Sequence, residues 1–228
     1  MSEAAADTGK CGLDVFYPIV PDIGWMRRVV PLGIRTIQLR VKDVPAGEVE
    51  RQIAESLTLT RRHGVQLIVN DYWREAIGLG ADYVHLGQED LAAADLAAIR
   101  AAGLRLGIST HSEQELEVAL AAGPDYVALG PIWETRLKVM KWAPQGLARI
   151  ADWKRRIGPL PLVAIGGITP ERAVAVVDAG AQSVAVITDF LTHPDPEARI
   201  ATWLAWAETA RSTGRDPLTF GSGRGDRV

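Results

Sequence analysis

Eight short apolar runs recur along the chain, and polar segments with helical character separate them. The runs cover residues 15–20, 34–40, 65–69, 83–86, 104–108, 125–129, 162–165 and 183–187. Short continuous apolar runs are typical of strands buried on both faces, and helical connections between them favour parallel pairing. The pattern predicts an α/β fold of the (β/α)8 TIM-barrel type, with an open doubly wound sheet as the alternative.

The repeating pattern also predicts how the chain is divided. Residues 13–213 hold all eight runs, so we expect a single (β/α)8 barrel domain there. Residues 1–12 are small and polar and are expected to form a flexible leader. Residues 214–228 are rich in Gly, Arg and Asp, and we expect a disordered tail.

Helix signals occupy the connections between the runs. Pro45 precedes and Gly64 follows the segment 46–63, a start and stop combination that is typical of helices. Asp90 is expected to cap a helix over residues 91–102. Further helices are expected over residues 72–79, 112–122, 145–157 and 196–211, and after the Thr169-Pro170 pair.

The composition argues against several functional classes. The net charge of -3 gives no basic field for nucleic acid or a membrane surface, so neither partner is expected. A lone cysteine, Cys11, provides no disulfide framework, which favours a cytoplasmic location. No apolar run approaches the roughly 18 residues that span a bilayer. The nucleotide motifs GxGxxG after the first run and GxxxxGK[ST] are both absent.

Acidic residues after the third and fourth runs predict a cation site. Asp71 follows the third run, and Asp90 follows the fourth. Neighbouring parallel strands would bring both carboxylates to the same edge of the sheet, where they could share a divalent cation with phosphate oxygens. The alternative is that both residues act only as helix caps.

The second run ends in alternating polar residues. Gln38, Arg40 and Lys42 are separated by Leu39 and Val41, so a period of two places the three polar side chains on one face. Arg40 and Lys42 would supply positive charge for a phosphate. A solvated edge strand with an ordinary polar face is the alternative.

A second anion site is predicted on the opposite side of the same end. Gly166 and Gly167 follow the seventh run, and Ile187 and Thr188 follow the eighth. Backbone amides at these positions can cradle a phosphate, whereas the alternative is that the glycines serve only a tight turn. Two anion sites imply two phosphorylated small-molecule substrates.

Two other segments carry weaker signals. The connection from residue 130 to about 144 is long for a barrel and carries Lys138, which indicates a functional or a disordered loop. Ser109 and His111 follow the fifth run, where serine is often a turn former and His111 suits a structural role as well as a ligand contact.

The chain resembles the thiamine-phosphate synthases over about residues 15–190. The motifs that carry the resemblance are, in order, QLRVK, IVNDYW, ADYVHLGQEDL, GISTHS, DYVALGPIWETRLK, AIGGI and AGAQSVAVIT. The resemblance implies a transferase of thiamine biosynthesis that joins hydroxymethylpyrimidine pyrophosphate to a thiazole or carboxythiazole phosphate. Pyrophosphate would leave first with the help of Mg²⁺, and the thiazole nitrogen would attack the resulting carbocation.

The resemblance also implies roles for particular residues. Gln38 and Ser109 would contact the pyrimidine, and Asp71 and Asp90 would hold Mg²⁺. The pyrophosphate would be bound by Arg40, Lys42, Asn70 and Lys138. The thiazole phosphate would be positioned by Thr135, Gly167, Ile187 and Thr188. Among these residues, Arg40, Lys42, Ser109 and Lys138 would act on the reacting groups.

One departure from the family leaves rival functions open. The loop motif usually resembles GPIFPTxTK, whereas here Glu134 replaces a proline and Leu137 replaces a threonine. A thiazole tautomerase with His111 as acid-base group, a Schiff-base aldolase, and a non-catalytic thiazole-phosphate sensor are the alternatives. The sequence leaves open the oligomeric state, a homo-oligomer included, as well as the preferred thiazole form and any closure of the loop.

Overall fold

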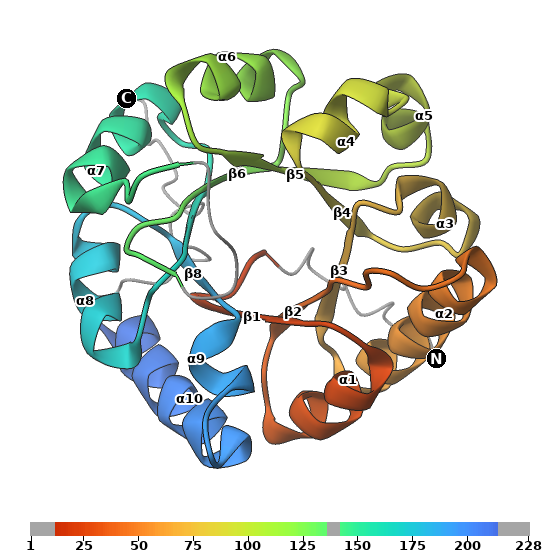
Figure 1. Cartoon of the computed structure of the whole chain (residues 1–228), viewed down its shortest axis with the longest axis horizontal. Helices are drawn as coiled ribbons and strands as arrows, with labels where there is room; N and C mark the ends of the chain where they lie inside the picture. Colours follow the sequence, from red (N-terminus) through yellow and green to blue (C-terminus); the bar gives the residue numbers. More distant parts are fainter. Residues whose placement is uncertain (1–11, 136–141, 214–228) are drawn as a thin grey trace, which may run out of the picture.

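Eight parallel strands close into a barrel in the order β1 to β8 (Figure 1), in a computed structural model that describes residues 12–135 and 142–213. The strands are β1 (Phe16–Val20), β2 (Thr36–Leu39), β3 (Gln66–Asn70), β4 (Tyr83–Leu86), β5 (Arg105–Thr110), β6 (Tyr126–Leu129), β7 (Leu162–Ile165) and β8 (Ser183–Val186). The predicted (β/α)8 barrel is therefore confirmed. Three predicted features lie outside the described residues: residues 1–11 of the leader, Lys138, and the tail over residues 214–228.

Helices follow every strand and surround the barrel (Figure 1). They are α1 (Ile23–Val29), the 3-10 turn η1 (Val30–Leu32), α2 (Ala46–His63), α3 (Trp73–Gly78), α4 (Gln88–Ala93), α5 (Leu96–Ala101), α6 (Glu113–Ala121), α7 (Gly146–Ile157), α8 (Pro170–Asp178), α9 (Thr188–Leu191) and α10 (Pro196–Ser212). Within the described ranges, no helix has both the length and the apolar character needed to cross a bilayer.

Helix α2 has the predicted boundaries, but the expected helix over residues 91–102 is wrong. Two short helices stand there, because the Asp95 side chain accepts a hydrogen bond from the Ala98 amide and starts α5. Asp90 lies inside the first turn of α4, whose N-cap is Gly87, so Asp90 is not the cap. The short helices α1 and α9 are additional to the predicted elements. Helix α1 buries Ile23, Met26 and Val29 at helical spacing, whereas α9 has only four residues and is too short to show a period.

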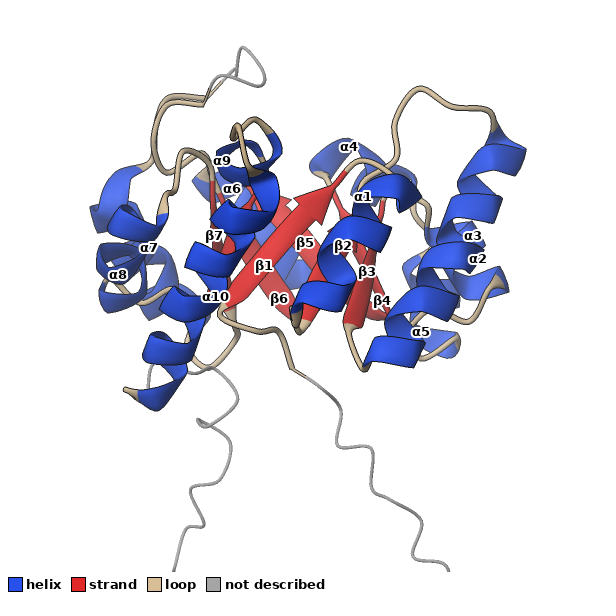
Figure 2. Ribbon diagram, turned by 90° about the horizontal axis from the view of Figure 1, so that it is seen from below, coloured by secondary structure: helices blue, strands red, loops and turns tan. Residues whose placement is uncertain are grey.

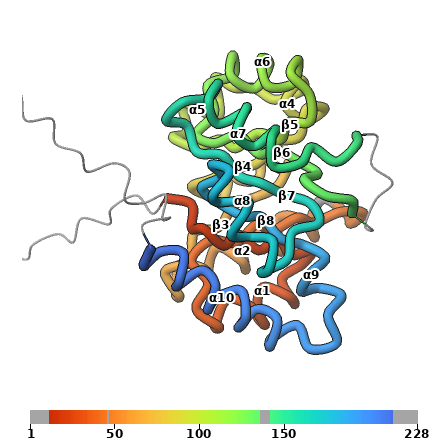
Figure 3. The backbone as a smooth tube through the Cα atoms, turned by 90° about the vertical axis from the view of Figure 1, so that its left-hand side faces the viewer, coloured from red at the N-terminus to blue at the C-terminus, as the bar shows by residue number. Residues whose placement is uncertain are grey.

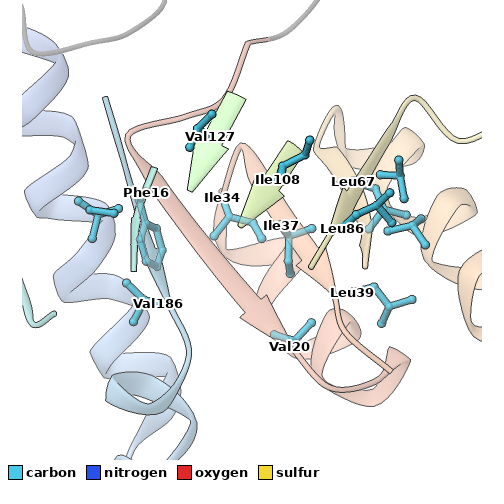
Figure 4. Packing of buried hydrophobic residues seen from close by; sticks show 14 of the residues in the cluster. Phe16, Val20, Ile34, Ile37, Leu39, Leu67, Leu86, Ile108, Val127 and Val186 are labelled. Carbon is cyan, nitrogen blue, oxygen red and sulfur yellow. The ribbon is translucent and has the colours of Figure 1, made fainter. Parts of the chain in front are cut away.

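The larger core lies between the strands and the surrounding helices. Strand residues alternate between this outer core and the barrel interior, so Phe16 points outward while Tyr17 points inward. The Phe16 ring stacks on Trp203 of α10 at 5.1 Å between centroids. Figure 4 shows Phe16 beside Val186 of the neighbouring strand β8, both within the outer core.

The barrel interior holds a second, smaller cluster that includes Leu13, Tyr17, Tyr83 and Tyr126. At the amino end of the barrel, the Arg211 guanidinium donates two 3.0 Å hydrogen bonds to the buried carboxylate of Asp14. Helix α10 is thereby joined to the base of the barrel.

The carboxyl ends of the strands form the opposite end of the molecule. Figure 2 shows the arrowhead of β1, helix α9 and the described start of the connection after β6 at this end. In Figure 3 the chain that leaves β6 projects on the same side as α9. This end is called the mouth of the barrel below.

Candidate active site at the mouth of the barrel

Every described residue predicted for the site lies near the carboxyl end of a strand. Gln38 and Ser109 lie within β2 and β5, and Asn70 is the last residue of β3. The others follow strands directly or within a few residues: Arg40, Lys42, Asp71, Asp90, Thr135, Gly167, Ile187 and Thr188. Because the strands are parallel and the barrel is closed, these positions share one end of the molecule.

Asp71 has an unusual backbone conformation directly after β3. Its φ of 66° lies in the left-handed region, which few residues other than glycine adopt. The Asp71 amide donates a 2.9 Å hydrogen bond to the His85 carbonyl on β4, and the Asp71 carbonyl accepts one of 2.8 Å from the Trp73 amide. The turn is therefore fixed at both sides, as is common for a strained residue at a functional site.

Lys42, Asp71 and Asp90 form one charged cluster at the mouth. The Lys42 ammonium pairs with Asp71 Oδ2, and Asp71 is close enough to Asp90 for its negative charge to act on the Asp90 carboxyl group. Burial, together with the negative charge of Asp71, raises the pKa of Asp90 above its ordinary value of 3.8, while Lys42 opposes that rise. The two carboxyl groups are thus close enough to repel each other, as predicted; Lys42 offsets part of this repulsion, and a bound divalent cation would offset more.

The donor set of this cluster suits a divalent cation that also binds phosphate. Among the residues that the structure describes, no group of three or more His, Cys, Asp and Glu side chains could enclose a metal ion. Asp71 and Asp90 therefore offer two carboxylates, and other ligands must come from a substrate or water. Mg²⁺ commonly takes one or two carboxylates together with phosphate oxygens and waters.

His85, on β4, was not predicted, although its side chain is buried in the barrel interior beside Tyr126. Its Nε2 lies 2.7 Å from Ser109 Oγ, and burial lowers its pKa to about 4. The negative charge of Asp71 opposes this fall, and the positive charge of Arg40 adds to it. A signal existed in the sequence, because DYVHLG and DYVALG are parallel repeats in which His85 stands where Ala128 stands.

Gly166 and Gly167 serve the packing of the loop after β6. A Cβ on Gly166 would lie 2.7 Å from the Pro131 Cα, and one on Gly167 would lie 2.7 Å from the Glu134 carbonyl oxygen. The Ile132 amide also donates to the Ile165 carbonyl at 2.9 Å. The side of each glycine that a Cβ would occupy is thus filled by residues 131–134, so both glycines are needed for this packing. Contact of their backbone amides with a phosphate stays a prediction.

Helix α9, which begins at Thr188, is joined to the outer helix α10 through Asp189. The Asp189 carboxylate accepts hydrogen bonds of 2.7 and 2.9 Å from Arg199 and one of 2.8 Å from the Trp203 indole. Both donors belong to α10. The position of Ile187 and Thr188 at the mouth is therefore fixed by contacts with the outer helix.

His111 has contacts that suit a structural role. Both its amide and its Nδ1 lie within 2.8 Å of Glu115 Oε2, and its ring stacks on Trp142 at 5.8 Å. The ring is thereby placed between α6 and the chain that leads into α7.

A closed parallel barrel with paired carboxylates and a lysine at the carboxyl ends of its strands defines the chain as a (β/α)8-barrel enzyme. Residues 17–190 match the family model described as thiamine monophosphate synthase. The chain belongs to this family, as the resemblance predicted.

Individual relatives agree with the family match. The thiamine-phosphate synthase of Rhizobium etli is 59% identical over 202 residues, which are 89% of this chain and 99% of that protein. That of Cronobacter sakazakii is 51% identical over 78% of this chain and 85% of its own length. The solved structure of a thiamine phosphate pyrophosphorylase from Pyrococcus furiosus superposes with a TM-score of 0.74 at 27% identity, covering 85% of this chain and 95% of that one.

Proposed function

We propose that this protein makes thiamine phosphate by coupling hydroxymethylpyrimidine pyrophosphate with thiazole phosphate or its carboxylated form. The contact of Lys42 with Asp71, and of Asp71 with Asp90, is the observation that carries the proposal within this family. In the reaction, the bond between the pyrimidine methylene carbon and the pyrophosphate oxygen breaks. Pyrophosphate leaves with the electrons of the old bond, and the thiazole nitrogen then supplies the electron pair of the new C–N bond. When the carboxylated thiazole is the substrate, its carboxyl group is also lost as carbon dioxide.

The leaving pyrophosphate is assigned to the side of the mouth formed by β2, β3 and β4. Arg40 and Lys42 are exposed cations there, and Asn70 ends β3 beside Asp71. Asp71 and Asp90 would hold Mg²⁺, which, when bound, would neutralise charge on the departing phosphate oxygens. Lys138 is assigned to the same group but lies outside the described residues. Positive charge on this side lowers the energy of the charge that develops as the pyrophosphate departs.

The thiazole phosphate is assigned to the opposite side of the mouth. Ile187 and Thr188 begin α9, Gly167 follows β7, and Thr135 is in the loop after β6. Backbone amides at such turns bind phosphate without a full charge of their own. The two reactants would then face each other across the barrel, which favours attack by the thiazole nitrogen and excludes competing water.

The alternatives receive less support from the described residues. None of the eight strands contains a lysine, so a Schiff base inside the barrel has no candidate. For a tautomerase, His111 would be the acid-base group, yet its Nδ1 is occupied by Glu115. Neither the tautomerase nor a thiazole-phosphate sensor requires the cluster of Lys42 with two carboxylates.

A cytoplasmic location belongs to the same proposal, because its support is the single cysteine and the composition. The deciding experiment incubates the protein with both substrates and detects thiamine phosphate by mass spectrometry, with Mg²⁺ and with a chelator. Thiamine phosphate formed in the presence of Mg²⁺ supports the proposal. Binding of the thiazole phosphate without any product would favour the sensor instead.

A further inference from the structure

A continuous chain of hydrogen bonds crosses the barrel interior from β2 to β5. Gln38 Nε2 donates to the Tyr17 hydroxyl at 2.8 Å, and that hydroxyl lies 3.0 Å from the Tyr126 hydroxyl. The Tyr126 hydroxyl lies 2.6 Å from His85 Nδ1, and His85 Nε2 lies 2.7 Å from Ser109 Oγ. The chain therefore joins the two residues assigned to the pyrimidine through three residues with no assigned role.

The interior is shaped for this chain. Gly107 lies opposite Tyr126 in the pairing of β5 with β6, and a Cβ on Gly107 would lie 2.1 Å from Tyr126 Cζ. Only glycine leaves room for the tyrosine ring against the strand. The His85 ring then stacks on the Tyr126 ring at 5.5 Å between centroids. Tyr17 and Tyr126 are almost fully buried, at 1% and 0% exposure.

Counting protons along the chain gives it one direction. Either tyrosine can be the donor at the Tyr17–Tyr126 contact, but Tyr17 already accepts from Gln38, so every proton of the chain is used only if Tyr17 donates to Tyr126. Tyr126 must then donate its own proton to His85 Nδ1. With Nδ1 as acceptor, His85 carries its proton on Nε2 and donates it to Ser109 Oγ. Burial raises the pKa of Tyr17 and of Tyr126, so both hydroxyls keep their protons.

This direction determines what the two ends present to a ligand. Ser109 Oγ accepts from His85, so its own proton is left for a ligand acceptor. Within the described part of the chain, Gln38 Oε1 has no recorded hydrogen-bond donor. If the Gln38 amide were flipped, so that its oxygen faced Tyr17, every hydrogen bond between Gln38 and Ser109 would have to exchange its donor and acceptor.

We propose that Tyr17, Tyr126 and His85 are positioning residues that fix Ser109 as a donor and Gln38 as an acceptor toward one heteroaromatic ring. This inference rests on the proposed function, because the ring is the pyrimidine of that reaction. An aminopyrimidine offers a ring nitrogen acceptor beside an amino donor, whereas the deaminated oxo form offers the two in the reverse order. The chain therefore selects the amino form, since a site with fixed partners leaves the wrong form unpaired.

The test replaces Tyr126→Phe, with Tyr83→Phe as the matched control. Tyr83 packs edge-on against Tyr126 at 5.6 Å and is also buried, but its hydroxyl is not part of the chain. We expect Tyr126→Phe to raise KM for the pyrimidine pyrophosphate by about tenfold, the effect of one lost hydrogen bond. Its preference for the amino over the oxo substrate should fall to a similar degree, and KM for the thiazole phosphate should not change. If Tyr126→Phe and Tyr83→Phe had the same KM for the pyrimidine pyrophosphate and the same preference for the amino substrate, the proposal would be overturned.

A second measurement needs no substrate. The ¹⁵N shifts of His85 in the full-length protein should show the proton on Nε2, and Tyr126→Phe should shift the tautomer toward Nδ1. A wild-type protein with the proton on Nδ1 would overturn the inferred direction. If the wild type makes no thiamine phosphate, the proposed function fails, and the assignment of the pyrimidine as the bound ring fails with it. The ¹⁵N spectrum would still test the direction of the hydrogen bonds from Gln38 to Ser109.

Tyr17→Phe is a second variant in case Tyr126→Phe does not fold. It separates Gln38 from the chain but leaves Tyr126 free to donate to His85. We expect an increased KM for the pyrimidine pyrophosphate with the His85 tautomer unchanged. A changed tautomer, or an unchanged KM in a folded protein, would contradict the proposal.

Discussion

The carboxylate pair gives the prediction that separates function from stability most clearly. We consider Asp71→Asn and Asp90→Asn, each made singly. Asparagine is chosen for residue 71 because its φ of 66° suits Asn better than Ala, for which the left-handed conformation costs about 1–2 kcal/mol. The Asn side chain also keeps the volume and part of the hydrogen bonding of Asp. Each variant therefore removes one negative charge and little else.

The expected change in stability is small. Two like charges about 4 Å apart repel each other by about 1 kcal/mol in water and about 4 kcal/mol at an effective dielectric constant near 20. Removal of either carboxylate relieves this repulsion but also weakens the attraction to Lys42, which is 43% exposed and therefore well screened. Because the two effects oppose each other, we expect the free energy of unfolding to change by no more than about 1 kcal/mol.

The expected change in turnover is large. A bound metal ion stabilises developing charge by several kcal/mol, so loss of one carboxylate ligand should lower Mg²⁺-dependent kcat/KM by about 100-fold. The assay compares kcat/KM over a range of Mg²⁺ concentrations with the midpoint of urea unfolding for each variant. Glu89→Gln, next to Asp90 and exposed, serves as the control for charge alone. Parallel losses of stability and activity would show that the pair is structural and would refute the reasoning.

The same variants predict a change in the pH dependence of stability. The pKa of Asp90 is raised in the folded protein, so the stability that its protonation provides is present at low pH. This contribution to the free energy of unfolding is lost as the pH rises from 3.8 through the raised pKa of Asp90 in the folded protein. Asp90→Asn should remove this decline, which urea unfolding at a series of pH values without Mg²⁺ would show. An identical decline in the variant would contradict the assignment.

Three other predictions concern the framework of the site. Gly107→Ala should destabilise the protein by about 3 kcal/mol or prevent folding, because its Cβ would overlap the Tyr126 ring, whereas Gly47→Ala, with open space around it, should be neutral in urea unfolding. Burial lowers the pKa of His85 from its ordinary 6.5 to about 4 in the folded protein. As the pH falls from 6.5 to 4, the unfolded chain therefore binds a proton at this residue that the folded protein does not, and the free energy of unfolding should fall by about 3 kcal/mol. His85→Gln should abolish that part of the acid loss, and an unchanged acid profile would contradict the burial of a neutral imidazole. Asp189→Asn should lower stability by about 2 kcal/mol and raise KM for the thiazole phosphate, because Arg199 keeps only the exposed Glu171 carboxylate as a charged partner. An unchanged melting temperature would show that α9 is held by other contacts.

The barrel could be predicted from the sequence because its signals are local. Each strand is a short apolar run, and helix α2 has Pro45 before it and Gly64 in the left-handed conformation after it. Local signals did not find α9, which has four residues and owes its place to contacts of Asp189 with α10. They also misplaced the cap of α5, because Asp90 and Asp95 are equally good caps on sequence alone.

The site was predictable where its residues follow strands and unpredictable where they lie inside them. Closure of the barrel brings the ends of all strands together, so Asp71 and Asp90 could be expected to meet. The chain through Tyr17 and Tyr126 depends on which strands face each other across the interior, and periodicity does not contain that information. The roles of the individual site residues stay predictions until they are tested.

The account depends most on a divalent cation held by Asp71 and Asp90 together with the leaving pyrophosphate. Mn²⁺ can replace Mg²⁺ for this purpose, because its free form has a strong EPR signal. The wild-type protein should remove the free Mn²⁺ signal in the presence of inorganic pyrophosphate, and Asp71→Asn should leave most of it. Equal loss of the signal with the wild type and with both Asn variants would contradict the central claim.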